Sequence, residues 1–269
     1  MTHAKEPMMR YETIEVTDDG RVATVTLARP DVRNAFNETM IAELTTAFDR
    51  IDAHASLRAV VLAARGPAFC AGADLNWMKK MAGFSDDENR ADARRLARML
   101  DAVYRCAKPV IARVHGDAYA GGVGLVAACD IAIAAEDVKF CLSEARLGLI
   151  PATIAPYVVR AMGERAARRY FATAEAFDCA KAAQLGFVHE RVPAGALDAS
   201  VAKLAEALCA NGPQAVRACK TLVRDVAGRA LDAALIEQTA GWIAKTRAGA
   251  EAREGVASFL EKRTPSWRA

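Results

Sequence analysis

The sequence predicts an α/β protein in which a sheet-containing core is followed by a helical C-terminal section. Short apolar runs alternate with amphipathic helical patterns over residues 10–142, the order expected of a layered fold with crossover connections. After residue 155 only helical patterns follow. The chain has 269 residues, 53% of them hydrophobic, which is enough to build a sizeable buried core.

The N-terminal part supplies the strands. Residues 10–16 and 22–28 are β-type runs around a turn at Asp18-Asp19-Gly20, which predicts a hairpin. Amphipathic helices are predicted at 37–53 and from Ser85, which has capping-box spacing, to a point before Pro109. The remaining predicted strands are apolar runs at 57–64, 109–116, 130–135 and 139–142.

The C-terminal part consists of helical patterns alone. Gly212-Pro213 marks one boundary clearly, because glycine follows one helix and proline opens the next. The predicted helices are 155–171, 176–185, 197–210, 213–227, 231–246 and 249–262.

Composition argues against several classes of function. The 36 basic and 33 acidic residues give a net charge of +3, too even a balance for a dedicated nucleic-acid surface. The seven cysteines stand singly without metal-ligand spacing, which favours small core residues in a reducing compartment. The N-terminus has no apolar signal region and no long uncharged apolar run occurs, so we expect a soluble, cytoplasmic protein.

A glycine-rich stretch, AYAGGVGLVA, has three interpretations. Gly122, Gly124 and Ala127 have the G-x-G-x-x-A spacing of a dinucleotide-binding helix. Against this, the predicted strand ends near His115, six residues intervene, and the next strand does not end in an acid. The glycines could instead allow a buried helix to pack closely. In the third interpretation, a helix that starts at glycine presents free N–H groups to developing negative charge.

The third interpretation finds partners elsewhere in the chain. The segment FCAGADLNWM (69–78) is a second turn of small residues between a strand and a helix. The segment SEARLGLIP (143–151) places one carboxylate, Glu144, in an apolar neighbourhood. Two backbone donors and one acid could therefore converge.

These segments resemble the enoyl-CoA hydratase/isomerase (crotonase) family. The motifs RPDVRNAFN, AFCAGADL, GDAYAGGVGLVAACDIAIA, FCLSEARLGLIP and AAQLGFVHERV occur in the family's order and spacing, over roughly residues 12–263. The resemblance implies a spiral of ββα units with the active site over residues 1–200, and a helical trimerisation section over 201–269. It also implies a homo-oligomer, either a trimer or a dimer of trimers.

The resemblance assigns the chemistry to three catalytic positions. It places the thioester oxygen of an acyl-CoA between the backbone N–H groups of Ala73 and Gly121, and it makes Glu144 the acid that handles the proton. Family hydratases commonly carry a second glutamate, and the matching position here is Gly124.

Two polar residues just upstream of Gly124 could hold the water in place of the missing glutamate. They are Asp117 and Tyr119, and the hypothesis rests on their proximity in sequence. A turn acid and a packed aromatic residue is the simpler interpretation of the pair.

For coenzyme A, the resemblance implies contacts from two facing loops and from the final helix. The final helix supplies Phe259 and Lys262 to the coenzyme A of a neighbouring subunit, although a core phenylalanine and a solvated lysine is an equal alternative. No metal is expected, and no cofactor apart from coenzyme A, which is part of the substrate. The loop residues are Val32, Arg33, Ala35, Ala71, Asp74 and Leu75.

The resemblance therefore implies an enoyl-CoA hydratase, with a double-bond isomerase that uses the single acid Glu144 as the alternative. Fatty-acyl hydratases are glycine-rich in the segment that matches residues 150–159, where this chain has bulkier residues. Together with AGGVGL, this resembles the bacterial subgroup that hydrates branched, carboxylated enoyl-CoAs such as 3-methylglutaconyl-CoA of leucine breakdown. The bulkier residues are Thr153, Ile154, Pro156 and Tyr157.

A binding function of another class is weighed against this one, because some relatives of the family bind RNA through a basic helix. Five acids lie among the arginines of residues 86–105, so an ion-paired, solvated helix face is favoured and nucleic acid is not an expected partner. The arginines are Arg90, Arg94, Arg95, Arg98 and Arg105.

Overall fold

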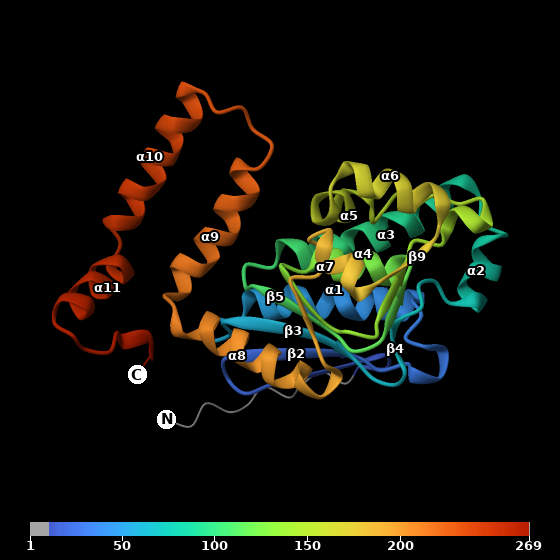
Figure 1. Cartoon of the computed structure of the whole chain (residues 1–269), viewed down its shortest axis with the longest axis horizontal. Helices are drawn as coiled ribbons and strands as arrows, with labels where there is room; N and C mark the ends of the chain where they lie inside the picture. Colours follow the sequence, from blue (N-terminus) through green and yellow to red (C-terminus); the bar gives the residue numbers. More distant parts are fainter. Residues whose placement is uncertain (1–10, 269) are drawn as a thin grey trace.

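The computed structural model describes residues 11–268. Residues 1–10 and residue 269 lie outside the described part. Two predictions therefore fall on undescribed residues: the absence of a signal region at the N-terminus, and the start of the first strand at Arg10. The described chain forms two sheets, with helices on both faces of the larger one (Figure 1).

The larger sheet has six strands in the order β1-β2-β3-β5-β7-β10. The first two form the predicted hairpin and pair antiparallel, with Ile14 opposite Leu27. The other pairs are parallel, as the crossover helices require. The strands are β1 (Ile14–Asp18), β2 (Val22–Leu27), β3 (Ala59–Ala64), β5 (Val110–Val114), β7 (Ile131–Ala135) and β10 (Glu190–Val192).

The smaller sheet has four strands of three residues each, in the order β4-β6-β8-β9. The first three run parallel, and β9 returns antiparallel to β8 with Phe177 opposite Phe140. Consequently β4, β6 and β8 point their carboxyl ends toward one edge. The strands are β4 (Ala68–Cys70), β6 (Asp117–Tyr119), β8 (Lys139–Cys141) and β9 (Ala176–Asp178).

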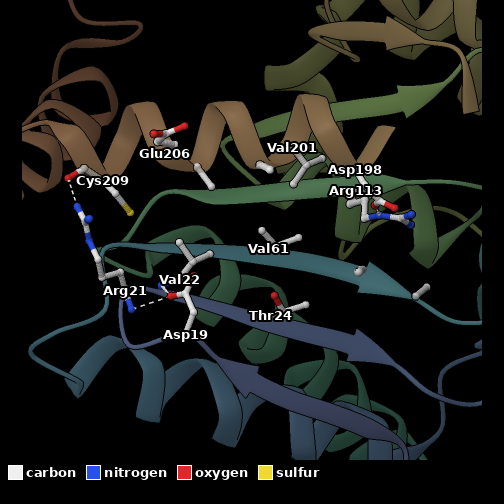
Figure 2. Close-up of a pocket in the computed structure, with 14 residues that line it drawn as sticks. Asp19, Arg21, Val22, Thr24, Val61, Arg113, Asp198, Val201, Glu206 and Cys209 are labelled. Atoms are coloured by element: carbon white, nitrogen blue, oxygen red, sulfur yellow. Dashed lines mark hydrogen bonds and ion pairs between the residues drawn. The ribbon is translucent and has the colours of Figure 1, made fainter. Parts of the chain in front are cut away.

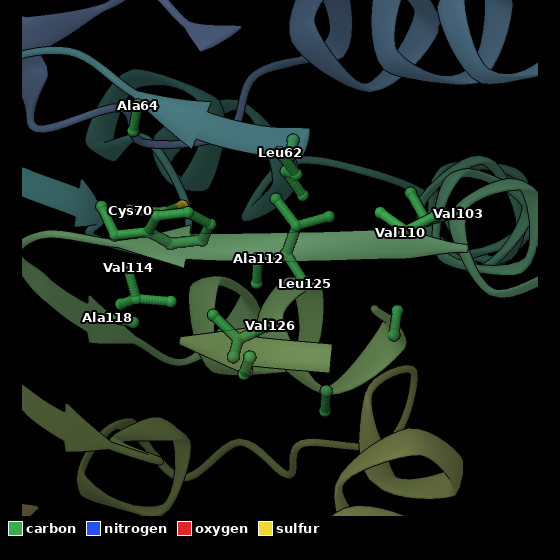
Figure 3. Close-up of a cluster of buried hydrophobic side chains, with 14 of the residues drawn as sticks. Leu62, Ala64, Cys70, Val103, Val110, Ala112, Val114, Ala118, Leu125 and Val126 are labelled. Atoms are coloured by element: carbon green, nitrogen blue, oxygen red, sulfur yellow. The ribbon is translucent and has the colours of Figure 1, made fainter. Parts of the chain in front are cut away.

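Helices cover both faces of the larger sheet (Figure 1). On one face lie α1 (Glu38–Ala53), α3 (Asp86–Arg105) and α4 (Gly121–Ala128). Because the sheet is covered on both faces, every residue of its strand β3 is buried. The predicted stripe of α1 is buried, and Ser85 forms the predicted capping box. Figure 3 shows the resulting core, in which Leu62, Ala112 and Leu125 lie together.

On the other face, α8 (Leu197–Ala210) packs against β3, β5 and β7. A groove of about 710 Å³ runs between this helix and the sheet (Figure 2). Its floor and roof are mostly apolar, and at its rim Arg113 and Asp198 form an ion pair at 2.5 Å. The guanidinium of Arg21 donates to the carbonyl of Cys209 at 2.6 Å and ties the sheet to α8.

Of the remaining helices, α2, α5, α6 and α7 connect or follow strands of the smaller sheet, and α9, α10 and α11 form a separate helical section. Figure 1 shows α9, α10 and α11 beside the core. An ion pair connects α9 to the core: Lys220 of α9 pairs with Asp130, next to β7, at 2.6 Å. No helix in residues 11–268 is both long enough and apolar enough to cross a membrane. The helices are α2 (Leu75–Met81), α5 (Ala155–Met162), α6 (Glu164–Thr173), α7 (Cys179–Gln184), α9 (Pro213–Val226), α10 (Ala233–Arg247) and α11 (Ala250–Leu260).

The structure corrects four expectations. The predicted helix 155–171 is two helices, because Gly163 has a φ of +80° and breaks the run. The predicted helix 176–185 begins with β9, since Phe177 pairs and stacks with Phe140 at 5.6 Å. The short strands β4, β6 and β10 were not expected. Of the seven free cysteines, Cys219 is exposed on α9 rather than in the core.

Candidate active site

Three neighbouring parallel strands each deliver one predicted catalytic residue to the same edge. Ala73 follows the end of β4 by three residues, Gly121 follows the end of β6 by two, and Glu144 follows the end of β8 by three. Since β4, β6 and β8 are adjacent and parallel, these three residues come from neighbouring chain segments. The topology therefore brings together segments that are far apart in the sequence.

Ala73 is held by a short parallel bridge to Phe36. The N–H of Phe36 donates to Gly72 at 2.7 Å, and the N–H of Asp74 donates to Phe36 at 2.8 Å. Within residues 11–268 the N–H of Ala73 itself donates to no protein atom. The bridge therefore uses the N–H groups of Phe36 and Asp74 and leaves that of Ala73 available to a ligand.

Gly121 is the first residue of α4, so its N–H has no acceptor within the helix. It is aimed by Ala120, whose φ of +45° and ψ of −117° are unusual for a residue with a Cβ. Such a conformation costs about 1–3 kcal/mol and persists only where the surroundings enforce it. Here Ala120 is held by its N–H, which donates to Cys141 of β8 at 2.8 Å.

Glycines let the two donor segments approach closely. A Cβ at Gly72 would lie 3.1 Å from that of Ala120, and a Cβ at Gly122 would overlap the carbonyl oxygen of Cys70. The glycines of the AYAGGVGLVA stretch therefore serve close packing, and the spacing of a dinucleotide fingerprint is coincidental. The predicted strand before this stretch, β5, does end next to His115, but the unexpected strand β6 fills most of the gap and ends directly before Ala120.

Glu144 opens a short 3₁₀ helix, η2 (Glu144–Leu147). Its Oε2 atom is buried and has no hydrogen-bond partner in the described chain. Burial raises the pKa of this carboxyl above its usual range. An unpartnered carboxyl with a raised pKa is suited to exchange a proton with a ligand.

Asp117 and Tyr119 lie on β6, and the carboxylate of Asp117 is used within the smaller sheet. Oδ1 of Asp117 accepts from the N–H of Lys139 at 2.8 Å, which secures β6 against β8. Burial, followed by the charge of Asp117, raises the pKa of Tyr119. Neither side chain bonds to the free Oε2 of Glu144, and their water-holding role stays a hypothesis.

The two predicted coenzyme A loops are joined by an ion pair that the sequence did not indicate. Arg29 donates to the carbonyl of Ala35 at 2.5 Å and to the carboxylate of Asp74 at 2.9 Å. Asp74 is buried and also caps α2 through the N–H groups of Asn76 and Trp77. Its carboxylate therefore has a structural role, and contact with coenzyme A stays a prediction.

Asn34 is a second residue that sequence reasoning missed. It is fully buried, adopts a φ of +55°, and its side chain donates to the carbonyls of Arg65 and Ala68 at 2.8 and 2.9 Å. Asparagine is the non-glycine residue that tolerates this backbone region best, which is a signal that the sequence alone contains. Asn34 fixes the loop that carries the predicted contacts.

The other predicted coenzyme A residues divide by exposure. Val32, Arg33 and Leu75 are exposed, whereas Ala35 is buried and Ala71 is partly buried. Phe259 and Lys262 are exposed at the end of α11, in the helical section beside the core. In the isolated chain they are not brought to the strand ends that carry Ala73, Gly121 and Glu144.

The predicted arginine-rich helix is largely ion-paired. Arg95 pairs with Asp92, Arg98 with Asp49 and Arg105 with Asp101, at 2.7, 3.0 and 2.7 Å. These pairs support the solvated-face interpretation. Within the described part of the chain, no three His, Cys, Asp or Glu side chains are grouped as a metal site requires.

Fold and site together define a class: a mixed α/β protein in which, within residues 11–268, two unused backbone donors and one partly buried acid lie at adjacent strand ends. The sequence pattern of the Enoyl-CoA hydratase/isomerase family matches residues 17–269. The chain belongs to this family, has its crotonase fold, and is an enzyme.

Individual relatives agree over nearly their whole length. A crystal structure of an enoyl-CoA hydratase from Shewanella pealeana has a TM-score of 0.93 at 42% identity, covering 96% of this chain and 97% of that one. Pseudomonas aeruginosa AtuE has a TM-score of 0.91 at 35% identity, covering 96% and 100%. Enoyl-CoA hydratase EchA19 of Mycobacterium tuberculosis is 33% identical, covering 93% and 94%.

Proposed function

We propose that the protein is an enoyl-CoA hydratase that adds water across the 2,3 double bond of an acyl-CoA thioester. The observation that carries the proposal is the arrangement of Ala73, Gly121 and Glu144 at the ends of three adjacent parallel strands. Relatives named enoyl-CoA hydratase support it.

In this mechanism the N–H groups of Ala73 and Gly121 hold the thioester oxygen. Glu144, as carboxylate, takes a proton from water while the water oxygen bonds to C3. The electron pair of the double bond moves onto the thioester as an enolate, and the two N–H groups stabilise its charge. The enolate then collapses and C2 takes the proton from Glu144. Loss of one such donor typically costs about 3–4 kcal/mol of transition-state stabilisation.

The test is to add a 2-enoyl-CoA to the purified protein and to follow the absorbance of the conjugated thioester. A hydratase removes the absorbance and forms a 3-hydroxyacyl-CoA. The proposal fails if the absorbance persists while 3-enoyl and 2-enoyl isomers interconvert, since that result identifies an isomerase.

For the acyl group we propose a branched, carboxylated substrate such as 3-methylglutaconyl-CoA of leucine breakdown. The bulky segment around Ile154, which is buried at the start of α5, supports a pocket shaped differently from that of a straight-chain enzyme. Comparison of kcat/KM for 3-methylglutaconyl-CoA and crotonyl-CoA tests this. A preference for crotonyl-CoA rejects it.

We also propose that the enzyme is a homo-oligomer built on trimers, in a reducing, cytoplasmic setting. Apolar side chains exposed on α9, α10 and α11 support the assembly, and seven free cysteines support the setting. Light scattering on the purified protein distinguishes trimer, hexamer and monomer. The exposed apolar residues are Leu222, Val223, Ile236, Ile243, Val256, Phe259 and Leu260.

A further inference from the structure

Gly124, where the family resemblance leads us to expect a second glutamate, is closed by packing. A Cβ atom at residue 124 would lie 2.5 Å from Cβ of Ile154 and closer still to its Cγ2. Ile154 is buried, with 1% of its surface exposed. No side chain fits at residue 124 unless Ile154 moves.

Ile154 cannot give way by a change of rotamer. Rotation about χ1 moves its outer carbons but leaves Cβ in place. Its backbone is fixed at the start of α5, because its carbonyl accepts from Val158 at 3.1 Å and the next N–H, of Ala155, donates to Pro151 at 2.9 Å. A larger residue at 124 must therefore displace α5 itself.

Helix α5 is held in turn by its neighbours. It packs along α4, and Tyr157 on its first turn meets Tyr104 of α3 edge-on, with ring centroids 5.3 Å apart. Val158 is fully buried. The wall that closes position 124 is thus part of the core and not the end of a mobile side chain.

Residue 124 shares a face of α4 with the oxyanion donor. Gly121 and Gly124 are three residues apart, and residues at this spacing lie on one side of a helix. Ile154 consequently packs about one turn along α4 from the N–H group assigned to the thioester oxygen. The closed position is next to the reacting centre.

We propose that Gly124 and Ile154 are a matched pair that closes the position of the second acid, so that Glu144 alone handles the reacting water. The inference rests on the proposed hydratase function. Gly124 has no side chain where the second glutamate would stand. Ile154 occupies the place of that glutamate with hydrocarbon groups, which neither donate nor accept hydrogen bonds. Ile154 is thus a positioning residue, which confines the water to Glu144.

The stability arm of the test is a double-mutant cycle. Gly124→Glu should lower Tm by about 5–10 °C, because overpacking displaces α5. Ile154→Gly should lower Tm by leaving a cavity, and the double variant should be more stable than the sum of the two losses. Gly124→Ala is a milder version, and Gly241→Ala in α10, where a Cβ meets no atom within 4 Å, is its matched control. A Gly124→Glu protein with the Tm of the wild type overturns the proposal.

The activity arm uses hydration rate and pH dependence. The double variant should hydrate at least about tenfold faster than Ile154→Gly. Its rate should also gain a second ionisation, because two carboxylates that share one water raise each other's pKa. If Ile154 has only a structural role, the pH profile of the double variant should keep a single ionisation. That result overturns the proposal. If the wild type hydrates no enoyl-CoA, the proposed function fails, whereas the stability coupling is measured without substrate.

Discussion

The guanidinium of Arg29 and the carboxylate of Asp74, 45 residues apart in the chain, pair at 2.9 Å and join the two loops assigned to coenzyme A. The pair is mostly buried, with side-chain exposures of 20% and 8%. Burial alone would raise the pKa of Asp74, but Arg29 and the N–H groups of α2 outweigh it and lower the pKa. The loop that carries Ala73 is therefore locked to the loop that carries Arg33.

Asp74→Asn should separate the ion pair from the helix cap, since asparagine still caps α2. We expect a loss of about 2–4 kcal/mol in the free energy of unfolding at neutral pH, and a raised KM for acyl-CoA. The lowered pKa means that the stabilisation is present above the ordinary pKa of an aspartate and is lost as the pH falls through the lowered value. Urea denaturation at neutral and acidic pH checks this.

Arg65→Met is the matched control for this prediction. Arg65 pairs with Glu15, but both side chains are exposed, at 60% and 43%. Exposed pairs contribute at most about 1 kcal/mol. A loss in Arg65→Met as large as that in Asp74→Asn would contradict the role assigned to the buried pair.

Gly122→Ala should damage the oxyanion hole rather than the substrate contacts. The added Cβ would overlap the carbonyl oxygen of Cys70, so either β4 or α4 must shift. We expect a loss of about 1–3 kcal/mol in stability, and a fall of at least about 100-fold in kcat if the N–H groups of Ala73 and Gly121 are misaligned. Steady-state kinetics at saturating acyl-CoA measures the effect.

Gly195→Ala serves as the comparison, because a Cβ there meets no atom within 4 Å. It should change neither kcat nor Tm appreciably. If Gly122→Ala behaves in the same way, the close approach of the two segments is not needed for catalysis.

Long periodic elements could be predicted from the sequence, whereas β4 and β6, two of the three short strands that carry the site, could not. The third, β8, lies within the predicted strand 139–142. The apolar stripe of α1 repeats over 16 residues, and the capping box of α3 is a local signal. In contrast, β6 has three residues, too few to show a period, and it exists because β4 and β8 flank it. The catalytic candidates were found through motifs and not through these strands.

Contacts between distant segments were also beyond the sequence. Gly124 marks a missing acid, but only the packing of α5 reveals that Ile154 fills the space. In the same way, the sequence shows Arg29 only as a loop residue, and its ion pair with Asp74 becomes evident only from the structure. Each of these contacts depends on how two segments that are distant in the sequence pack against each other, which no local pattern encodes.

Glu144→Gln should reduce hydration by about 10²–10⁴-fold and should also stabilise the protein at neutral pH. Burial raises the pKa of Glu144 in the folded state, so folding is favoured while this carboxyl is protonated. That contribution is fully present below the ordinary pKa of a glutamate and is lost as the pH rises through the raised value. Thermal melts across this range should show the advantage of the variant growing with pH.

The activity of the wild type should fall as the pH drops through the raised pKa of Glu144, because the protonated acid cannot accept a proton from water. The exposed residue Glu206 supplies the control, and Glu206→Gln should leave both the pH profile and Tm unchanged. Equal pH dependence of Tm in the wild type and Glu144→Gln would contradict the assigned burial.

Mixed oligomers test whether a neighbouring subunit completes each site. Phe259 is 81% exposed on α11, away from the strand ends of its own subunit. A Phe259→Ala, Lys262→Met double variant should raise KM for acyl-CoA, while Glu144→Gln lowers kcat. When the two variants are denatured and refolded together, some sites combine an intact Glu144 with an intact neighbouring Phe259. In a trimer mixed at random, about a quarter of the sites are intact, so about a quarter of the wild-type kcat/KM should return when the rate is measured at acyl-CoA concentrations well below KM. If each site uses Phe259 and Lys262 of its own chain, kcat/KM of the mixture stays as low as the average of its two components, because no subunit then holds an intact set.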